Sequence, residues 1–287
     1  MAVVEPSDIL VTDRVAVVTG AGAGIGQGIA VGLAAFGADV VIVEIDPDRA
    51  AATRALVEAE GREAFVIPTD ATDSEQVAAA IAAAHAHFGR IDILVNNVGG
   101  VRKQDFVDQS ERSWRRHIDI NLVSMLAATS AAAKLMIDAG NGGSIVNVAS
   151  IEALRAAPGF AVYAACKAAM ANFSRSMALE LAAHGIRVNT LAPDLIATPG
   201  IRGLIGGPVP DPLPELEPDV AEGVARYIPI GEEGSVEDMA AATVFLSSKM
   251  GRYITGVTLP VDGGTFASSG WNRKANADGY QLADGLG

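Results

Sequence analysis

A tyrosine and a lysine four residues apart, Tyr163 and Lys167, are the residues of this sequence best suited to exchange a proton with a substrate. They stand in an alanine-rich stretch of helical character, so we expect their side chains on one face, a turn apart. An unperturbed tyrosine has a pKa of about 10 and is a poor base at neutral pH, but a cation within about 4–6 Å lowers that pKa. The pair is typical of a tyrosine base assisted by lysine, although a packed tyrosine beside a surface lysine has the same spacing.

A glycine-rich turn near the N-terminus has the character of a phosphate-binding loop. The predicted strand Arg14–Thr19 runs directly into glycines at positions 20, 22, 24 and 26, and a helical pattern follows at once. Glycine permits positive φ and lets backbone N–H groups approach a pyrophosphate, and the helix N-terminus adds partial positive charge. The turn predicts a dinucleotide site, with an ordinary strand-to-helix turn as the alternative.

Two carboxylates end the next two predicted strands. Glu44 lies eighteen residues beyond Gly26, where it can accept hydrogen bonds from both ribose hydroxyls of an adenosine. A 2′-phosphate would meet Glu44 as a like charge with no Arg or Lys beside it, which favours NAD over NADP. Glu44 could instead be a solvated acid. Asp70 is suited to accept from an adenine amino group or to cap a turn, and both interpretations stay open.

Short β-branched runs alternate with longer helical stretches, which is the pattern of βαβ units and a parallel sheet covered on both faces. We therefore expect an α/β fold, a Rossmann-type doubly wound sheet of seven parallel strands. Asp46 followed by Pro47, and Asp73 followed by Gln76 as in a capping box, predict the starts of two helices. The predicted strands are Arg14–Thr19, Asp39–Glu44, Ala64–Pro68, Ile91–Asn96, Gly143–Ala149, Ile186–Leu191 and Thr258–Val261.

The same pattern predicts a single domain over residues 14–264, preceded by an N-terminal extension, 1–13. Between residues 198 and 229 prolines and glycines are so frequent that no regular structure is expected there. A long irregular segment of this kind is usually a lid, a binding loop or a disordered region. The C-terminal tail, 265–287, is polar, and we expect it either to anchor on a neighbouring subunit or to be disordered.

The composition argues against several classes of partner. The formal net charge is −13, and such a negative field repels nucleic-acid backbones and anionic membrane surfaces. A single cysteine, Cys166, allows no intrachain disulfide and indicates a reducing compartment. The N-terminus lacks the pattern of a signal peptide, and no run of about 18 apolar residues predicts a membrane span. We expect a cytoplasmic protein with no nucleic-acid or membrane partner, and no metal site, because the four histidines share no spacing with cysteines or acids.

Several short motifs follow one another in a specific order and spacing along the chain. They are Thr19-Gly-x-x-x-Gly24-x-Gly26, Asn96-Asn97-Val98-Gly99, Asn121, Ser150, Tyr163-x-x-x-Lys167 and Asn189-x-x-x-Pro193. Together they resemble the shorter branch of the short-chain dehydrogenase/reductase superfamily, over roughly residues 10–264. The resemblance implies an NAD(H)-dependent oxidoreductase that interconverts a secondary alcohol and a ketone, and a homotetramer is the expectation because equivalent alanine-rich helices form subunit contacts in relatives.

The resemblance also implies roles for four catalytic residues. Tyr163 would exchange a proton with the substrate oxygen as hydride moves between the substrate carbon and the nicotinamide, and Ser150 would hydrogen-bond that oxygen. Lys167 would hold the nicotinamide ribose and keep the pKa of Tyr163 low, while Asn121 would anchor a water that passes protons. Taken alone, Ser150 is equally a strand-end hydroxyl that caps the next segment, and Asn121 a helix residue bonded to backbone.

Contacts to NAD are implied in the same way. Asn97, Val98 and Gly99 would wall the adenosine side, and Ile196 and Thr198 would meet the carboxamide. The full set of expected cofactor contacts is Gly20, Gly24, Ile25, Gly26, Glu44, Asp70, Ala71, Asn97, Val98, Gly99, Tyr163, Lys167, Pro193, Ile196 and Thr198.

One departure from the family pattern lies beside the expected nicotinamide site. Asp194 stands where a glycine usually follows Pro193, and we hypothesise that it tunes access or favours a substrate with a donor group. The segment after Thr198 carries apolar side chains that favour an apolar substrate, such as a 3-oxoacyl group, a hydroxysteroid or a terpenoid alcohol, although they could merely pack the loop. These apolar residues are Ile201, Leu204, Ile205, Val209, Leu213 and Leu216.

Two other functions compete with this interpretation. A catalytically silent dinucleotide-binding regulator or scaffold would have lost some of the four catalytic residues, and none is lost. A sugar-nucleotide epimerase or dehydratase shares the tyrosine–lysine pair but usually has a different glycine spacing and a larger C-terminal substrate region. The glycine turn present here favours the dehydrogenase.

Overall fold

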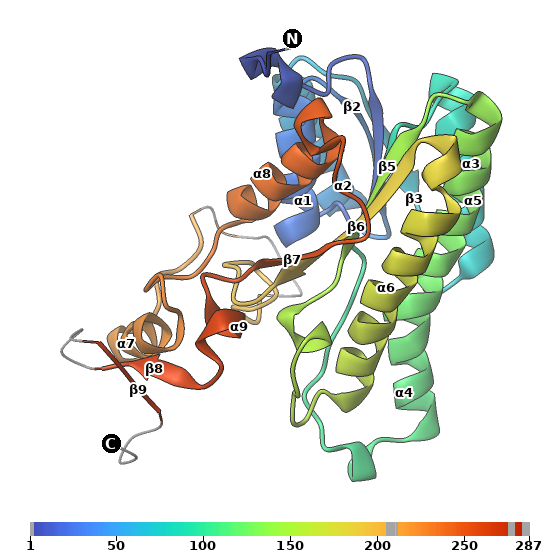
Figure 1. Ribbon diagram of the computed structural model, residues 1–287. Helices are drawn as coiled ribbons and strands as arrows, with labels where there is room; N and C mark the ends of the chain where they lie inside the picture. The colour runs from blue at the N-terminus through green and yellow to red at the C-terminus, as the bar shows by residue number, and fades with distance from the viewer. Residues whose placement is uncertain (1–2, 205–209, 211, 275–278, 283–287) are drawn as a thin grey trace.

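The computed structural model describes residues 3–204, 210, 212–274 and 279–282. Its centre is a parallel sheet of seven strands in the order β3-β2-β1-β4-β5-β6-β7 (Figure 1). The predicted Rossmann-type doubly wound fold is therefore confirmed, and each predicted strand is present with ends that differ by at most two residues. The strands are β1 (Val15–Thr19), β2 (Asp39–Glu44), β3 (Ala64–Pro68), β4 (Ile93–Asn96), β5 (Gly143–Val148), β6 (Ile186–Pro193) and β7 (Thr258–Val261).

Helices cover both faces of the sheet (Figure 1). Successive strand residues point to opposite faces, so Val18 packs into one hydrophobic cluster with α1, α2 and α8, while Val17 packs into the other with α3, α5 and α6. Strands buried on both faces need continuous β-branched runs, and this is why they could be predicted. The helices are α1 (Gly24–Ala35), α2 (Pro47–Ala59), α3 (Ser74–Phe88), α4 (Glu111–Ile118), α5 (Ser124–Ala139), α6 (Ala161–Glu180), α7 (Pro218–Tyr227), α8 (Val236–Ser247) and α9 (Thr265–Ser268), with 3₁₀ turns at Pro6–Ile9, Phe106–Asp108, Ile151–Ala153, Ala182–His184 and Lys249–Gly251.

The two predicted helix starts are correct, but one of them is capped differently. Asp46 caps α2, with Pro47 as the first helical residue, and Asp73 caps α3. Gln76, however, does not return to the backbone N–H of Asp73 as a capping box requires. Its Oε1 accepts from the backbone N–H of Asp70 at 3.1 Å, and its Nε2 donates to Asp73 Oδ2 at 3.0 Å. Because the side-chain amide of Gln76 donates and accepts at once, it links the turn at Asp70 to Asp73, the cap of α3.

Two expectations about the C-terminal part of the chain are corrected. Regular structure does form within the segment 198–229, because α7 begins at Pro218, where a missing N–H costs nothing, and no further proline interrupts it before Pro229. The tail contains an antiparallel pair, β8 (Trp271–Arg273) and β9 (Tyr280–Leu282). The predicted lid residues Ile205 and Val209 lie outside the described residues.

One continuous helical run, Glu111–Ala139, joins α4 to α5 through a π-helical turn. By length and composition alone this run could cross a membrane, and 44% of its apolar window is buried within the fold. Core helices of soluble proteins pass the same test, and α5 packs its buried face into the hydrophobic cluster beneath the sheet. The run therefore gives only weak evidence for a membrane span.

Candidate active site

The carboxyl ends of the central strands bring the predicted site residues to one edge of the sheet. The glycine turn follows β1, Asn97 follows β4, Ser150 lies just after β5, and Asp194 follows β6. The helix α6 then places Tyr163 near Ser150. In doubly wound sheets this edge is where ligands bind, beside the point at which the strand order reverses.

The glycine turn requires glycine for two different physical reasons. Gly20 and Gly24 have φ of 63° and 57°, in the left-handed region that side chains disfavour. Gly26 allows close packing instead, because a Cβ there would lie 2.1 Å from the carbonyl oxygen of Gly20. Asn97 fixes the turn from the neighbouring strand, since its Nδ2 donates to the carbonyl oxygens of Thr19 at 3.1 Å and Gly20 at 3.0 Å.

The start of α1 fits a dinucleotide pyrophosphate. Its N-cap is Ala23, no side chain caps it, and its first turn contains no acid, whereas side chains of Asp or Ser cap α2, α3, α4 and α8. A helix start without a side-chain cap presents N–H donors and partial positive charge to an external anion. Beside it, Glu44 Oε2 accepts from the N–H of Gly22 at 2.9 Å, and Glu44 Oε1 accepts from the N–H groups of Ile45 and Asp46. The carboxylate thus lies at the rim of the turn, where ribose hydroxyls would meet it.

Two other predicted cofactor residues, Val98 and Thr198, lie against the same turn. A Cβ on Gly20 would lie 3.0 Å from Val98 Cγ2, and one on Gly24 would lie 3.3 Å from Thr198 Cγ2. Ile196 is buried and forms a parallel bridge with Gly234. Val98 and Thr198 therefore lie against the turn from two different strands' ends.

The side chain of Asp70 caps a turn in this structure. Its Oδ1 accepts from the backbone N–H of Thr72 at 2.9 Å and from the Thr72 hydroxyl at 2.7 Å. Both hydrogen bonds hold the pKa of Asp70 below its usual value, the backbone bond more strongly. The turn-capping interpretation is thus satisfied, and a contact of Asp70 or Ala71 to adenine stays a prediction.

Lys167 is buried beneath the tyrosine ring. Its ammonium donates to the carbonyl oxygen of Val148 at 2.8 Å and lies 5.6 Å from the centre of the Tyr163 ring, within the range of a cation–π interaction. Only 3% of the lysine is exposed, and this burial lowers the pKa of Lys167 to about 8.

In this structure the pKa of Tyr163 lies above its ordinary value, and a lowering of that pKa by Lys167 stays a prediction. Burial raises the pKa of Tyr163, a hydrogen bond with Ser150 counteracts part of that rise, and the negative charge of Glu152 adds to it. The Lys167 ammonium is directed to the Val148 carbonyl and lies 5.6 Å from the centre of the Tyr163 ring. In this state Tyr163 is therefore a neutral proton donor at neutral pH.

Ser150 and Asn121 make the backbone contacts that the sequence left open as alternatives. Ser150 Oγ accepts from the N–H of Glu152 at 3.2 Å, which caps the following 3₁₀ turn. Asn121 is fully buried in the π-helical turn, where its Nδ2 donates to the carbonyl oxygens of Gly100 at 2.8 Å and His117 at 2.9 Å. These contacts fix both side chains, and they do not prevent either from meeting a ligand.

Asn121 and Lys167 converge at Gly99. A Cβ on Gly99 would lie 2.9 Å from Asn121 Oδ1 and 3.2 Å from Lys167 Nζ. The π turn shifts the helical register by one residue, and such insertions are frequent at functional sites. The three residues, far apart in sequence, therefore form one polar cluster next to Tyr163.

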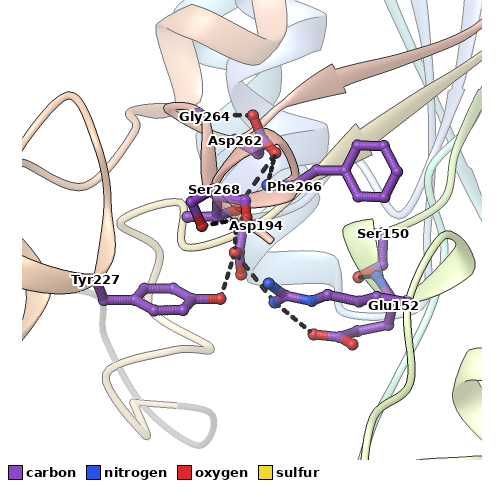
Figure 2. A network of polar contacts seen from close by, with 10 residues as sticks. Ser150, Glu152, Asp194, Tyr227, Asp262, Gly264, Phe266 and Ser268 are labelled. Atoms are coloured by element: carbon purple, nitrogen blue, oxygen red, sulfur yellow. Dashed lines mark hydrogen bonds and ion pairs between the residues drawn. The ribbon is translucent and has the colours of Figure 1, made fainter. Parts of the chain in front are cut away.

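Asp194 is the centre of a polar network that the sequence did not predict (Figure 2). Its Oδ2 accepts from Tyr227 Oη at 2.8 Å, from Thr265 Oγ1 at 2.6 Å and from an Arg155 guanidinium nitrogen at 3.2 Å. The Asp194 side chain is only 9% exposed. Because protein donors already occupy Oδ2, the structure favours a role in access over direct recognition of a substrate donor.

The donors to Asp194 come from three separate segments. Arg155 lies in the loop between Ser150 and Tyr163, Tyr227 ends α7, and Thr265 begins α9. Arg155 also donates to Glu152 Oε1 at 3.0 Å. No local pattern marks Tyr227 or Thr265 as partners of Asp194, because they lie 33 and 71 residues away in the sequence.

The unliganded protein is expected to become more stable as the pH rises from about 7 to 10, with Lys167 as one cause. Its pKa is about 8 when folded and 10.5 ordinarily, so the unfolded chain binds more protons between these values and the free energy of unfolding rises with pH. The full contribution is about 3 kcal/mol. Urea unfolding of the native chain and of Lys167→Met at both ends of this range measures it. An equal pH dependence in the two proteins would contradict the burial of a charged Lys167.

Comparisons with known proteins agree with this geometry. A family model described as "Enoyl-(Acyl carrier protein) reductase" matches residues 20–265. The chain is 38% identical over 255 residues to 2-dehydro-3-deoxy-D-gluconate 5-dehydrogenase of Escherichia coli strain K12, an alignment that covers 88% of this chain and 96% of the relative.

Solved structures share the fold over almost the whole chain. A 7α-hydroxysteroid dehydrogenase complexed with NADH and 7-oxo glycochenodeoxycholic acid has a TM-score of 0.83 at 31% identity, and the match covers 91% of this chain and 98% of that one. A protein of Agrobacterium tumefaciens assigned as 2-deoxy-d-gluconate 3-dehydrogenase, with bound NADP, has a TM-score of 0.79 at 35% identity, covering 91% and 99%. Both kinds of nicotinamide dinucleotide are thus found in proteins with this fold.

Proposed function

Since the chain belongs to the short-chain dehydrogenase/reductase superfamily, we propose that it is an NAD(H)-dependent enzyme that interconverts a secondary alcohol and a ketone. The observation that carries the proposal is the arrangement of Tyr163, Ser150 and Lys167 at the same sheet edge as the uncapped start of α1. Tyr163 and Ser150 can exchange a proton with a substrate oxygen and hold that oxygen, and the start of α1 can bind a dinucleotide beside them.

Bound at the glycine turn, the dinucleotide would supply the hydride acceptor or donor. In reduction, Tyr163 gives its hydroxyl proton to the ketone oxygen. In oxidation, Tyr163 first loses its hydroxyl proton to solvent, and the phenolate then takes the proton of the alcohol. Ser150 holds that oxygen by a second hydrogen bond, because its hydroxyl already lies within hydrogen-bonding range of Tyr163. Asn121 fixes the polar cluster that it forms with Gly99 and Lys167. It is suited to anchor a water between Lys167 and solvent.

The charges around the tyrosine support an uncharged substrate. Glu152 and Asp194 are two carboxylates beside the single guanidinium of Arg155, which is already hydrogen-bonded to both. An anionic group bound beside these three side chains would meet two carboxylates and a guanidinium already paired with them, while the Lys167 ammonium is held by the Val148 carbonyl. We therefore propose a neutral, largely apolar alcohol or ketone, such as a hydroxysteroid, a terpenoid alcohol or a 3-oxoacyl group, rather than the sugar acids named for the bacterial relative.

A substrate panel tests this proposal. Oxidation and reduction are measured with neutral cyclic and steroidal alcohols, a 3-oxoacyl thioester, polyols and gluconate, each with both nicotinamide cofactors. We expect kcat/KM to be highest for a neutral apolar substrate with NAD(H). Turnover of gluconate above all neutral compounds would contradict the charge argument, and no turnover of any compound would favour a silent dinucleotide-binding protein.

The proposed assembly is a cytoplasmic homotetramer. Alanine-rich stretches on α5 and α6 support it, because small side chains let helices approach closely, and Leu179 at the outer surface of α6 is 80% exposed. Light scattering of the purified chain measures the mass of the assembly, and a monomer would contradict this part of the proposal.

Replacing Asp194 with asparagine is expected to raise KM about tenfold with a smaller change in kcat. The substitution removes the charge that holds Tyr227 and Arg155, so closing α7 over the substrate costs more free energy, and that cost appears in KM. Tyr227→Phe removes one donor and should give a smaller effect in the same direction. The control is Tyr253→Phe, since Tyr253 is 94% exposed. Unchanged kinetics in Asp194→Asn would show that the network does not govern access.

A further inference from the structure

A cleft of about 270 Å³ opens at the sheet edge opposite the glycine turn. Its walls come from segments that precede β1, β4, β5 and β6 and from the turn that follows α8. We call it the basic cleft, because its charged lining residues are Arg14, Arg90, Asp92, Arg187, Lys249 and Arg252. None of these residues belongs to the site proposed for the dinucleotide or the substrate.

Two of the cations are neutralised within the protein. Arg90 forms a bidentate pair with Asp92, at 2.8 Å and 2.7 Å, and Asp92 also accepts from the N–H of Val15. Lys249 donates to Asp8 at 2.8 Å. Asp92 and Asp8 are thus already paired, while Asp13 acts on Arg90 and Glu5 acts on Lys249 only through their charge.

The other three cations form no ion pair among the described residues, although the charge of Arg252 acts on Asp8. Among the residues that the structure describes, none of Arg14, Arg187 and Arg252 has a carboxylate within ion-pairing distance. Arg14 donates to the carbonyl oxygen of Ser247 at 2.8 Å, and Arg187 donates to that of Ile254 at 3.3 Å. These carbonyl contacts orient the guanidinium groups without cancelling their charge.

Arg187 is the least solvated of the three. Burial, and then the positive charge of Arg14, lower the pKa of Arg187 to about 10. A partly buried cation that faces a second cation is costly unless a counter-charge relieves it. The chain as a whole carries a net charge of −13, so this local excess of positive charge is opposite in sign to the mean field of the molecule.

Glycines keep the floor of the cleft open. Gly142 and Gly185 have φ of 73° and 69°, and a Cβ on Gly142 would lie only 2.8 Å from the carbonyl oxygen of Gly185. The backbone therefore comes close to the guanidinium groups with no side chain between them. The space left has room for a phosphate group and a short organic portion.

We propose that the basic cleft binds a small phosphate-bearing anion through Arg14, Arg187 and Arg252. Guanidinium forks match the geometry of phosphate oxygens, and two or three of them around one group give charge-assisted, directional hydrogen bonds. The site lies at the end of the sheet away from the chemistry, so its occupation is separate from the proposed dehydrogenase reaction.

Calorimetric titration with pyrophosphate, at constant ionic strength set by sodium chloride, tests the proposal. We expect saturable binding with a dissociation constant below about 1 mM, and an affinity at least about tenfold lower in Arg14→Gln and in Arg252→Gln. Arg187 is not replaced, because it is partly buried and its replacement risks a variant that fails to fold. The matched control is Arg54→Gln, because Arg54 lies on the exposed side of α2, away from the basic cleft, and pairs with Glu58.

The variants also separate the basic cleft from the start of α1, which is a second place where pyrophosphate can bind. Binding that persists unchanged in Arg14→Gln and Arg252→Gln would come from the glycine turn and would overturn the proposal. The proposal would also be overturned if titration of the native chain with pyrophosphate gave no more heat than the same titration with sodium chloride. A parallel titration with succinate distinguishes the ligand chemistry, and equal affinity for succinate and pyrophosphate would contradict a phosphate-specific site.

Discussion

Tyr163→Phe is expected to lower kcat by about 10²- to 10⁴-fold while leaving dinucleotide affinity nearly unchanged. Phenylalanine keeps the ring that packs over Lys167, whose ammonium lies 5.6 Å from the ring centre, so the fold and the cofactor pocket should persist. Only the hydroxyl that exchanges the substrate proton is lost. Steady-state kinetics with the best substrate of the panel, together with fluorescence titration of NADH, measure the two effects.

The same variant separates the proposed enzyme from a protein that only binds dinucleotides. Tyr253→Phe, on an exposed tyrosine, controls for general effects of removing a hydroxyl. Near-full activity in Tyr163→Phe would contradict the proposal that Tyr163 exchanges the substrate proton. Loss of both turnover and NADH binding would instead mean that Tyr163 supports the cofactor pocket, and then Ser150→Ala would have to carry the test of proton transfer.

Features that depend on neighbouring residues could be predicted from the sequence. The strands were predicted almost to the residue because both of their faces are buried, which demands runs such as Val15–Val18. The glycine turn was predictable because Gly20 and Gly24 occupy backbone conformations that other residues avoid. Tyr163 and Lys167 lie on one helix, so their spacing alone placed them on one face.

Features that depend on distant contacts could not be predicted in this way. Asp194 was noticed only as a departure from a family pattern, and its partners Tyr227 and Thr265 are 33 and 71 residues away. The raised pKa of Tyr163 could not be predicted either, because helical spacing reveals neither the burial of its ring nor the nearby charge of Glu152. Burial and hydrogen-bond direction decide a pKa, and neither is visible in a motif.

The proposed preference for NAD rests on the position of a single carboxylate, Glu44. Glu44 ends β2 and its two oxygens accept backbone hydrogen bonds on both sides, from Gly22 and from Ile45 and Asp46. These bonds hold the carboxylate against the phosphate-binding turn. Ribose hydroxyls can donate to it there, whereas a 2′-phosphate would face it as a second negative charge.

Glu44→Gln is therefore expected to shift the ratio of kcat/KM for NAD over NADP by about 10²-fold toward NADP. The amide keeps one acceptor for the N–H of Gly22 but loses the charge that strengthens hydrogen bonds from ribose and repels a 2′-phosphate. Adding Ile45→Arg should increase the shift, because Ile45 is 62% exposed and a guanidinium there could pair with the phosphate. Glu60→Gln, on the exposed end of α2, is the control. If the native chain already used NADP(H) better than NAD(H), or if Glu44→Gln left the ratio unchanged, Glu44 would not be the residue that selects the cofactor.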